Sequence, residues 1–276
     1  LSYFDLAKFK SDSAVTYHLL AEALRRGHNN RSHFVGDPDY FDVPVSQLLS
    51  KERTKELAKT IDLKKATKST VVKPLELITE SRDTTHYSII DNEGNAVSNT
   101  YTLGYSFGSG VTIPGTGILM NNQMNNFAYR YGDKKERGRG ASTGNRFEPG
   151  KNPMSTMAPT MIFNKEGELV LVTGSPGGSL IPAAILRVIT GIIDFDLDIG
   201  QATMLPRVHK DWPKTGILYE RTVNSDVVRI INKRIGHKMT PEHTMGSTQS
   251  IHIINGVNYG YADLRRPGAS VSSQEN

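Results

Sequence analysis

The stretch TTHYSIID, residues 84–91, decides how the rest of the chain is interpreted. It starts a strand abruptly after a polar run, ESRD, at residues 80–83. The turn-forming sequence DNEGN, residues 91–95, separates it from a second β-rich run. Because an Asn-x-Gly turn between two β-rich runs is typical of a hairpin, we predict strands at Thr84–Ile90 and Ala96–Leu103. Taken alone, two threonines before a histidine are explained as β-branched residues that open a strand.

The composition excludes several kinds of site. A chain of 276 residues can bury a substantial core in one large domain or two smaller ones. It contains no cysteine, which excludes disulfides, zinc–thiolate sites and a cysteine nucleophile. The net charge of +5 permits an anionic partner. We expect no nucleic-acid partner, no metal, because the histidines lack metal-ligand spacing, and no membrane span, because the apolar run 180–193 contains Arg187 and Pro182.

The remaining patterns predict helices and hairpins in alternation. The predicted helices are Ser13–Arg26 with Gly27 as its cap, Val45–Ile61 with a break near Lys51–Arg53, the buried helix Leu180–Ile193, Ile199–Met204, and Ser225–Ile235 with Gly236 as its stop. The further predicted strands are Ile118–Asn121, the hairpin Thr160–Asn164 and Leu169–Thr173, and the hairpin Ser250–Ile254 and Val257–Tyr261. Lys64–Thr79 is predicted to be an exposed connector, and Phe127–Asn152 a long basic loop. These patterns indicate an α+β fold.

Six stretches, in the same order, resemble the small subunit of the γ-glutamyltranspeptidase family. They are TTHYS at 84–88, TYT at 100–102, GILMNNQM at 117–124, PMSTMAPT at 153–160, TGSPGGS at 173–179 and MGSTQS at 245–250. Upstream, GDPDY at 36–40 and the pair Val43-Pro44 resemble the end of that family's large subunit. The resemblance covers nearly the whole chain, and the ordered set is far more specific than any single motif.

The resemblance implies a four-layer αββα sandwich of the N-terminal nucleophile hydrolase type. It also implies that residues 1–83 are the C-terminal part of a large subunit and that residues 84–276 are the small catalytic subunit. The remainder of the large subunit would then be a partner in a heterodimer. Any export signal would lie on the segment before Leu1, so the compartment stays open, with a secreted or periplasmic location as candidates.

Thr84 is the expected nucleophile. If the bond between Asp83 and Thr84 is cut, the free α-amine, with a reference pKa of about 8, can accept the hydroxyl proton of the same residue. By resemblance, the same hydroxyl first cuts that bond through an ester that water hydrolyses. Thr102 matches a family threonine that assists this step, although a plain strand threonine is the alternative. Thr85 and His86 are expected to be structural neighbours only.

The other site residues also come from the resemblance. Gly177 and Gly178, between a strand and a helix, match the pair that holds the oxyanion, and glycine there allows close approach to a ligand. Ser155 and Thr156 match two serines that bind the substrate's α-carboxylate, and Gln123 matches a residue of the same pocket. No cofactor is expected. Arg265 and Arg266 resemble a family arginine, but the sequence assigns them no role.

Two departures from the family pattern concern the substrate. Gly104 replaces an Asn, and Asn126 replaces an Asp that pairs with the substrate's α-ammonium. Losing these contacts should weaken binding of a free ammonium by roughly ten- to a hundredfold. The hypothesis is therefore a substrate without that ammonium: a glutaryl amide, or an interior residue of poly-γ-glutamate. Two functions remain open: a γ-glutamyl or glutaryl hydrolase or transferase, and a non-catalytic homologue that binds an anionic polymer through residues 130–146.

Overall fold

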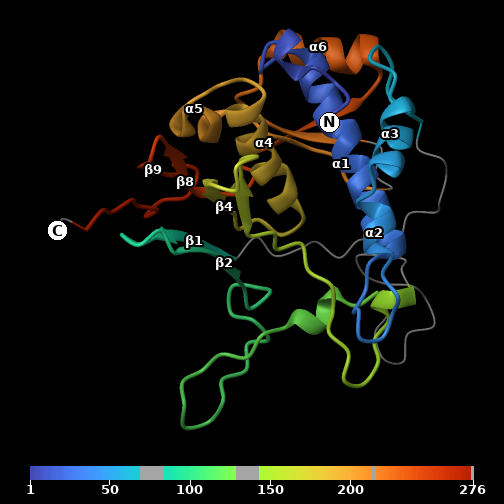
Figure 1. Cartoon of the computed structure of the whole chain (residues 1–276). Helices are drawn as coiled ribbons and strands as arrows, with labels where there is room; N and C mark the ends of the chain where they lie inside the picture. The colour runs from blue at the N-terminus through green and yellow to red at the C-terminus, as the bar shows by residue number, and fades with distance from the viewer. Residues whose placement is uncertain (69–83, 129–142, 213–215, 275–276) are drawn as a thin grey trace. The chain divides into compact units, whose positions relative to one another are not determined.

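The structure is a computed structural model that describes residues 1–68, 84–128, 143–212 and 216–274 (Figure 1). The chain forms two compact units, and it passes from one to the other several times. Unit 1 consists of Leu1–Thr79, Asn122–Ser155 and Val208–Glu242, and unit 2 consists of Glu80–Asn121, Thr156–Arg207 and His243–Asn276. Unit 1 therefore contains residues from both sides of the expected cleavage point. The predicted boundary between residues 83 and 84 would separate two polypeptides after cleavage, and it does not coincide with the boundary between the compact units. It stays a prediction.

Unit 1 is built on a long helix, α1 (Ala14–Phe34). Ser13 caps its start, because its side chain accepts a hydrogen bond from the Thr16 amide at 3.2 Å. The prediction that Gly27 ends this helix is wrong, since the helix continues for seven more residues. The φ of Gly27 is not in the left-handed region, and apart from the helix backbone no described atom would lie within 4 Å of an added Cβ. Neither the backbone nor a steric contact therefore ends the helix at Gly27.

The other N-terminal helices are short. A single 3-10 turn, η1 (Leu6–Lys8), precedes α1. The helix expected over Val45–Ile61 is broken as predicted, into α2 (Val45–Leu48) and α3 (Lys51–Lys59). The break falls at Leu49 and Ser50, slightly earlier than expected, because the Ser50 side chain caps α3 by accepting from the Arg53 amide at 3.1 Å. The connector expected after residue 64 is described only as far as Lys68.

A three-stranded sheet in unit 1 was not predicted. It consists of β5 (Val208–His209), β6 (Gly216–Glu220) and β7 (Lys238–Glu242) in that order. Strands β5 and β6 are antiparallel, whereas β6 and β7 are parallel. The parallel pair is connected by α6 (Ser225–Ile230) and a π-turn, η5 (Ile231–Ile235), as a parallel connection requires. The predicted stop at Gly236 is confirmed by its φ of 91°.

Unit 2 begins with the hairpin predicted from the opening stretch. Strands β1 (Thr85–Ile90) and β2 (Ala96–Tyr101) pair antiparallel, with Thr85 opposite Tyr101 and Ile90 opposite Ala96. The Asp91 carboxylate closes the turn by accepting from the amides of Glu93 and Asn95. The strand predicted at Ile118–Asn121 is wrong: the segment forms only an isolated bridge between Thr112 and Leu119.

The second sheet of unit 2 has the order β3-β4-β8-β9 and is antiparallel throughout. Its strands are β3 (Thr160–Phe163), β4 (Leu169–Thr173), β8 (Gln249–Ile254) and β9 (Val257–Ala262). Both predicted hairpins are confirmed. Asn255 and Gly256 have φ values of 52° and 77°, the left-handed pair that a two-residue hairpin turn needs.

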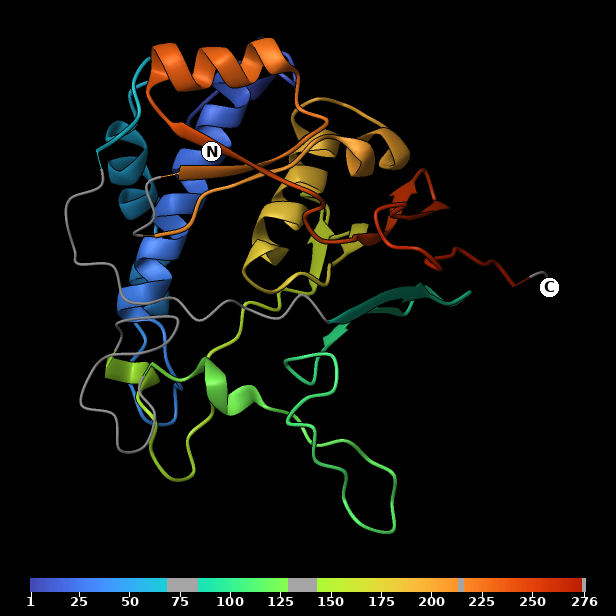
Figure 2. The same cartoon turned by 180° about the vertical axis from the view of Figure 1, so that it is seen from behind.

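The layers of unit 2 follow from what covers each side of this sheet (Figures 1 and 2). Helices α4 (Ile181–Ile193) and α5 (Ile199–Met204) pack on it through a core of Leu171, Val188 and Ile199. On the other side lies the β1-β2 hairpin, where the Ser88 hydroxyl donates to the Gln249 carbonyl at 2.8 Å. One helical layer and two sheet layers thus agree with the expected αββα order, and the α+β class is confirmed.

Among the residues that the structure describes, no helix combines the length and the apolar character that crossing a membrane requires.

Candidate active site

Thr84 lies immediately before β1 and is 5% exposed. Its main-chain carbonyl accepts a hydrogen bond from the Arg266 guanidinium, with Nη1 at 2.6 Å from the oxygen. Arg266 follows β9 and had no role that the sequence could assign. The start of β1 is therefore held from both sides, by pairing with β2 and by a charged hydrogen bond. Asp83 lies outside the described residues.

Thr102 lies just beyond β2, which ends two residues earlier than predicted. Thr85 is opposite Tyr101 in the hairpin, so an extension of this register by one residue faces Thr84 with Thr102. The Thr102 hydroxyl oxygen accepts a hydrogen bond from the Gly104 amide at 2.9 Å. Gly104 has a φ of 95°, a conformation that glycine adopts without strain.

His86 packs against Gly174, the first residue of the glycine loop, residues 174–178, which follows β4. Its Nδ1 is 2.7 Å from the Thr100 hydroxyl oxygen and its Nε2 is 3.2 Å from that of Ser88. Burial lowers the pKa of the imidazole to about 4, because the charged form loses its hydration. His86 is therefore neutral near pH 7 and a much weaker base than a free α-amine. This geometry agrees with the structural role expected for it.

Gly174 makes the close packing of that ring possible. An added Cβ there would lie 2.2 Å from His86 Cε1 and 2.4 Å from Nδ1. Real Cβ atoms essentially never approach other atoms so closely, so the ring and a side chain at position 174 cannot both occupy this space. Neither residue signals this contact in the sequence, because the partners are far apart along the chain.

The two predicted oxyanion glycines lie between β4 and α4. Gly177 has a φ of 133° and Gly178 a φ of 57°, and Gly178 opens a short 3-10 turn, η4 (Gly178–Leu180). Both residues are buried. The preceding Ser175 hydroxyl donates to the Pro176 carbonyl at 2.6 Å and accepts from the Ser247 amide at 3.0 Å. The loop therefore has a defined conformation that only glycine adopts readily at its two positive-φ positions.

One cavity of unit 2 is lined by residues next to the predicted site residues Thr84 and Gly177, although neither of these two residues lines it. It has a volume of about 270 Å³ and is lined by β1, β8, the glycine loop and the C-terminal segment. Its lining residues are Thr85–Ser88, Pro176, Gln249 and Arg266–Ser270. The residue after Thr84 and the residue before Gly177 thus share one cavity wall. Thr156, also in this unit, lies four residues before β3.

The remaining predicted site residues belong to unit 1. Gln123 and Asn126 form the ends of a 3-10 turn, η2 (Gln123–Asn126). The Asn126 side-chain amide donates to Gln123 Oε1 at 2.5 Å. A residue that sequence reasoning missed, Asn145, joins this turn to Met154, which directly precedes Ser155. Nothing in the sequence distinguishes Asn145 from the other polar residues of its loop.

The GDPDY motif supports the same part of unit 1. Asp37 Oδ2 accepts from the Asn152 amide at 2.6 Å and Oδ1 accepts from the Asp39 amide at 3.1 Å. The hydrogen bond from Asn152 keeps the pKa of the Asp37 carboxyl below its usual value. An added Cβ on Gly36 would lie 2.4 Å from the Gly144 backbone. The motif therefore acts as a scaffold for the segment that leads to Ser155.

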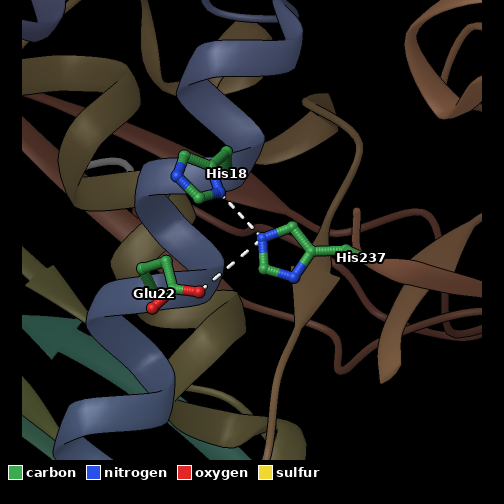
Figure 3. A group of neighbouring side chains, drawn as sticks. All are labelled: His18, Glu22 and His237. Atoms are coloured by element: carbon green, nitrogen blue, oxygen red, sulfur yellow. Dashed lines mark hydrogen bonds and ion pairs between the residues drawn. The ribbon is translucent and has the colours of Figure 1, made fainter. Parts of the chain in front are cut away.

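A cluster of metal-ligand residue types meets within unit 1 (Figure 3). His18 Nδ1 is 2.7 Å from His237 Nε2, which is 3.7 Å from Glu22 Oε1. The sequence does not indicate this contact, because His237 lies 219 residues after His18. Cations crowd the group: Arg26 pairs with Glu22, and Lys210 Nζ is 3.0 Å from His237 Nδ1.

Burial and Lys210 together lower the pKa of His237 to about 3. Adding a divalent cation beside these positive charges is electrostatically unfavourable, so we interpret the cluster as a buried hydrogen-bond network. The expectation that the chain holds no metal stays a prediction.

Comparisons with known proteins identify the family of the chain. The family model for γ-glutamyltranspeptidase matches residues 1–273. A glutathione hydrolase proenzyme of Escherichia coli is 39% identical over 96% of this chain and 46% of its own length. The chain thus spans about half the length of the curated relatives it matches.

Two solved structures extend the comparison. A cephalosporin acylase from Bacillus halodurans has a TM-score of 0.81 at 27% identity, covering 99% of this chain and 48% of that one. A γ-glutamyltranspeptidase of Helicobacter pylori has a TM-score of 0.61 at 36% identity, covering 66% of this chain and 100% of that one. With its ordered motifs, its fold and a family match over almost its entire length, the chain belongs to the γ-glutamyltranspeptidase family.

Proposed function

We propose that this chain carries the catalytic threonine of a hydrolase or acyltransferase that cuts its own backbone before Thr84 and then acts on γ-glutamyl or glutaryl amides. The observation that carries the proposal is the position of Thr84. It is buried directly before β1, its carbonyl accepts a hydrogen bond from Arg266, and its neighbour Thr85 lines the same cavity as Pro176, the residue before Gly177. The chain would work together with the remainder of a large subunit.

Self-cleavage is the first step. The Thr84 hydroxyl attacks the Asp83 carbonyl, the amide nitrogen of Thr84 takes up the hydroxyl proton and leaves as the free α-amine, and an ester forms between Asp83 and the threonine side chain. Water then hydrolyses this ester, which gives Asp83 a C-terminal carboxylate and restores the Thr84 hydroxyl. Thr102, opposite Thr84 in the extended register of the hairpin, is suited to hydrogen-bond the attacking hydroxyl.

The mature site would then transfer an acyl group. The α-amine accepts the hydroxyl proton while the hydroxyl oxygen of Thr84 attacks the substrate amide. Backbone amides of Gly177 and Gly178 stabilise the oxyanion, an effect worth about 2.7–4 kcal/mol per donor in other enzymes. The leaving amine takes up the proton, and water or a second amine then releases the acyl group from Thr84.

The two departures from the family pattern, Gly104 and Asn126, favour an acyl donor without a free α-ammonium. Ser155, Thr156 and Gln123 would bind the α-carboxylate, whereas Asn126 offers a neutral amide where a carboxylate would pair with the ammonium. A charged hydrogen bond contributes about 1.5–3 kcal/mol, against about 1 kcal/mol for a neutral one. Glutaryl amides are the first candidate and poly-γ-glutamate the second. Among the relatives, an Acylase ACY 1 proenzyme of a Pseudomonas species is 34% identical over 87% of this chain.

A mass spectrum of the protein as its gene encodes it tests the proposal. We expect two products, one ending at Asp83 and one starting at Thr84, and a single uncut chain in Thr84→Ala. Turnover of γ-glutamyl and glutaryl anilides then tests the substrate class. An uncut wild-type protein without turnover would overturn the enzymatic function. A strong preference for the γ-glutamyl compound would overturn only the glutaryl assignment.

A further inference from the structure

Asn145 is a buried polar residue that the mechanism above does not use. It is 0% exposed and ends a 3-10 turn, η3 (Thr143–Asn145). Its side-chain amide donates to the Asn126 carbonyl at 2.8 Å, and its Oδ1 accepts from the Met154 amide at 3.0 Å. Its own carbonyl accepts from the Ala128 amide at 2.8 Å. Three backbone groups from two separate segments thus depend on one residue.

These segments carry the predicted substrate-binding residues of unit 1. Asn126 and Gln123 are the ends of η2 and bond to each other. Met154 is 6% exposed and directly precedes Ser155. The side chain of Asn145 therefore sets the distance between η2 and the backbone that presents Ser155.

We propose that Asn145 is a positioning residue for substrate binding, which holds Gln123 and Ser155 at the spacing that the α-carboxylate of the acyl donor requires. The inference rests on the proposed function. Asn145 itself is bonded to the backbone on both sides and does not touch the reacting atoms.

The chemistry of the two bonds explains why this position needs asparagine. The side chain must present one donor and one acceptor at the same branch point, and both are paired because Asn145 itself is fully buried. Aspartate keeps the acceptor for Met154 but turns an oxygen toward the Asn126 carbonyl. Leucine keeps the approximate shape and removes both bonds, which leaves a buried amide and a buried carbonyl without partners.

The packing around the turn makes compensation difficult. A Cβ on Gly144 would lie 2.5 Å from the Phe41 ring, and Phe127 is 1% exposed with its ring 5.4 Å from that of Phe147. The turn therefore cannot shift toward either segment to restore a lost bond. Loss of the amide should instead change the distance between η2 and Ser155.

The test uses Asn145→Leu and Asn145→Asp, with Leu20→Ala as the matched control. Leu20 is 2% exposed and lies in α1, outside η2, η3 and the segment that leads to Ser155, so its truncation lowers stability without changing a residue of those segments. We expect KM for the acyl donor to rise about ten- to a hundredfold in Asn145→Leu, with complete self-cleavage and kcat within a few-fold of wild type. Leu20→Ala should lower the melting temperature and leave KM unchanged.

Asn145→Asp provides a second readout in case the leucine variant does not fold. Burial raises the pKa of a carboxyl group, and the protonated acid can again donate to the Asn126 carbonyl. The ratio of its KM to that of wild type should therefore fall as the pH is lowered from 8 to 5, whereas the same ratio for Leu20→Ala stays flat.

The inference is overturned if folded Asn145→Leu has a KM within twofold of wild type. It is also overturned if the KM ratio of Asn145→Asp does not change with pH, or if KM and self-cleavage decline in step with stability, as a general loss of packing would produce. These results require an active wild type. A wild-type protein that neither cuts itself nor turns over any acyl donor contradicts the proposed function instead.

Discussion

Gly174→Ala should disrupt the packing of His86, which lies on β1, the strand that begins directly after the proposed nucleophile. The new methyl carbon would lie 2.2 Å from His86 Cε1, whereas ordinary contact begins at 3.4 Å. The ring must therefore move by about 1.2 Å. His86 is 5% exposed and hydrogen-bonded on both nitrogens, so the movement cannot occur without breaking contacts. His86 is also only two residues from Thr84.

The magnitude follows from two terms. Overpacking of a well-packed site costs about 1–3 kcal/mol, and each lost hydrogen bond costs about 1 kcal/mol. We expect Gly174→Ala to lower the free energy of unfolding by about 2–5 kcal/mol and to slow self-cleavage before Thr84. Gly27→Ala is the control: no described atom would lie within 4 Å of its Cβ, and alanine favours a helix by about 1 kcal/mol.

A double-mutant cycle with His86→Ala provides the decisive assay. Removing the ring removes the clash, so the double variant should lose at least about 1 kcal/mol less stability than the sum of the single variants. Chemical denaturation measures these free energies, and denaturing electrophoresis measures cleavage. Additive losses, or a Gly174→Ala variant as stable as wild type, would refute the reasoning.

Three further predictions concern ionisable side chains of unit 2. The Arg207 guanidinium donates to Asp263 Oδ2 at 2.7 Å, and both groups are fully buried. Asp263→Asn removes the counterion of this guanidinium, so denaturant titration should show a loss of about 3–5 kcal/mol in the free energy of unfolding. The pKa of His86 in the folded protein, about 4, lies below its unfolded value of about 6.5. The contribution of the buried neutral ring to stability is therefore complete above pH 6.5 and declines toward pH 4. As the pH is lowered across this range, the melting temperature should fall less steeply in His86→Ala than in wild type. Arg266→Met removes the hydrogen bond to the Thr84 carbonyl and should slow self-cleavage about tenfold, equivalent to about 1.4 kcal/mol, with partial rescue by lysine in a gel time course.

The elements that sequence patterns predicted are those with strong local signals. The hairpins of unit 2 alternate in polarity and have turn residues with positive φ, such as Asn255 and Gly256. Strands β5 to β7 lack such signals: β5 has two residues and β7 contains Pro241. Strands β6 and β7 pair across a helical segment. The helical periodicity of that segment predicts a helix there, but it does not indicate which strands pair.

The residues of the candidate site also differ in how far the sequence indicates them. Thr84 and the glycine pair are assigned from ordered motifs, and their roles stay predictions. The contacts of Arg266 with Thr84, and of Gly174 with His86, join residues more than 80 positions apart, and no local pattern encodes them. The role of Asn145 could not be predicted either, because a sequence does not distinguish a buried asparagine that bonds to the backbone from a solvated one in a loop.

The path of the chain through unit 1 has a consequence if the proposed self-cleavage occurs. Helix α1 precedes the proposed cleavage point, and it packs in the same unit as β5 and α6, which follow that point. The core of unit 1 would therefore be shared between the two products. Dilution alone could not separate the two products, because their separation would expose both halves of that core to water. Renaturation from urea would become a second-order reaction between two different polypeptides.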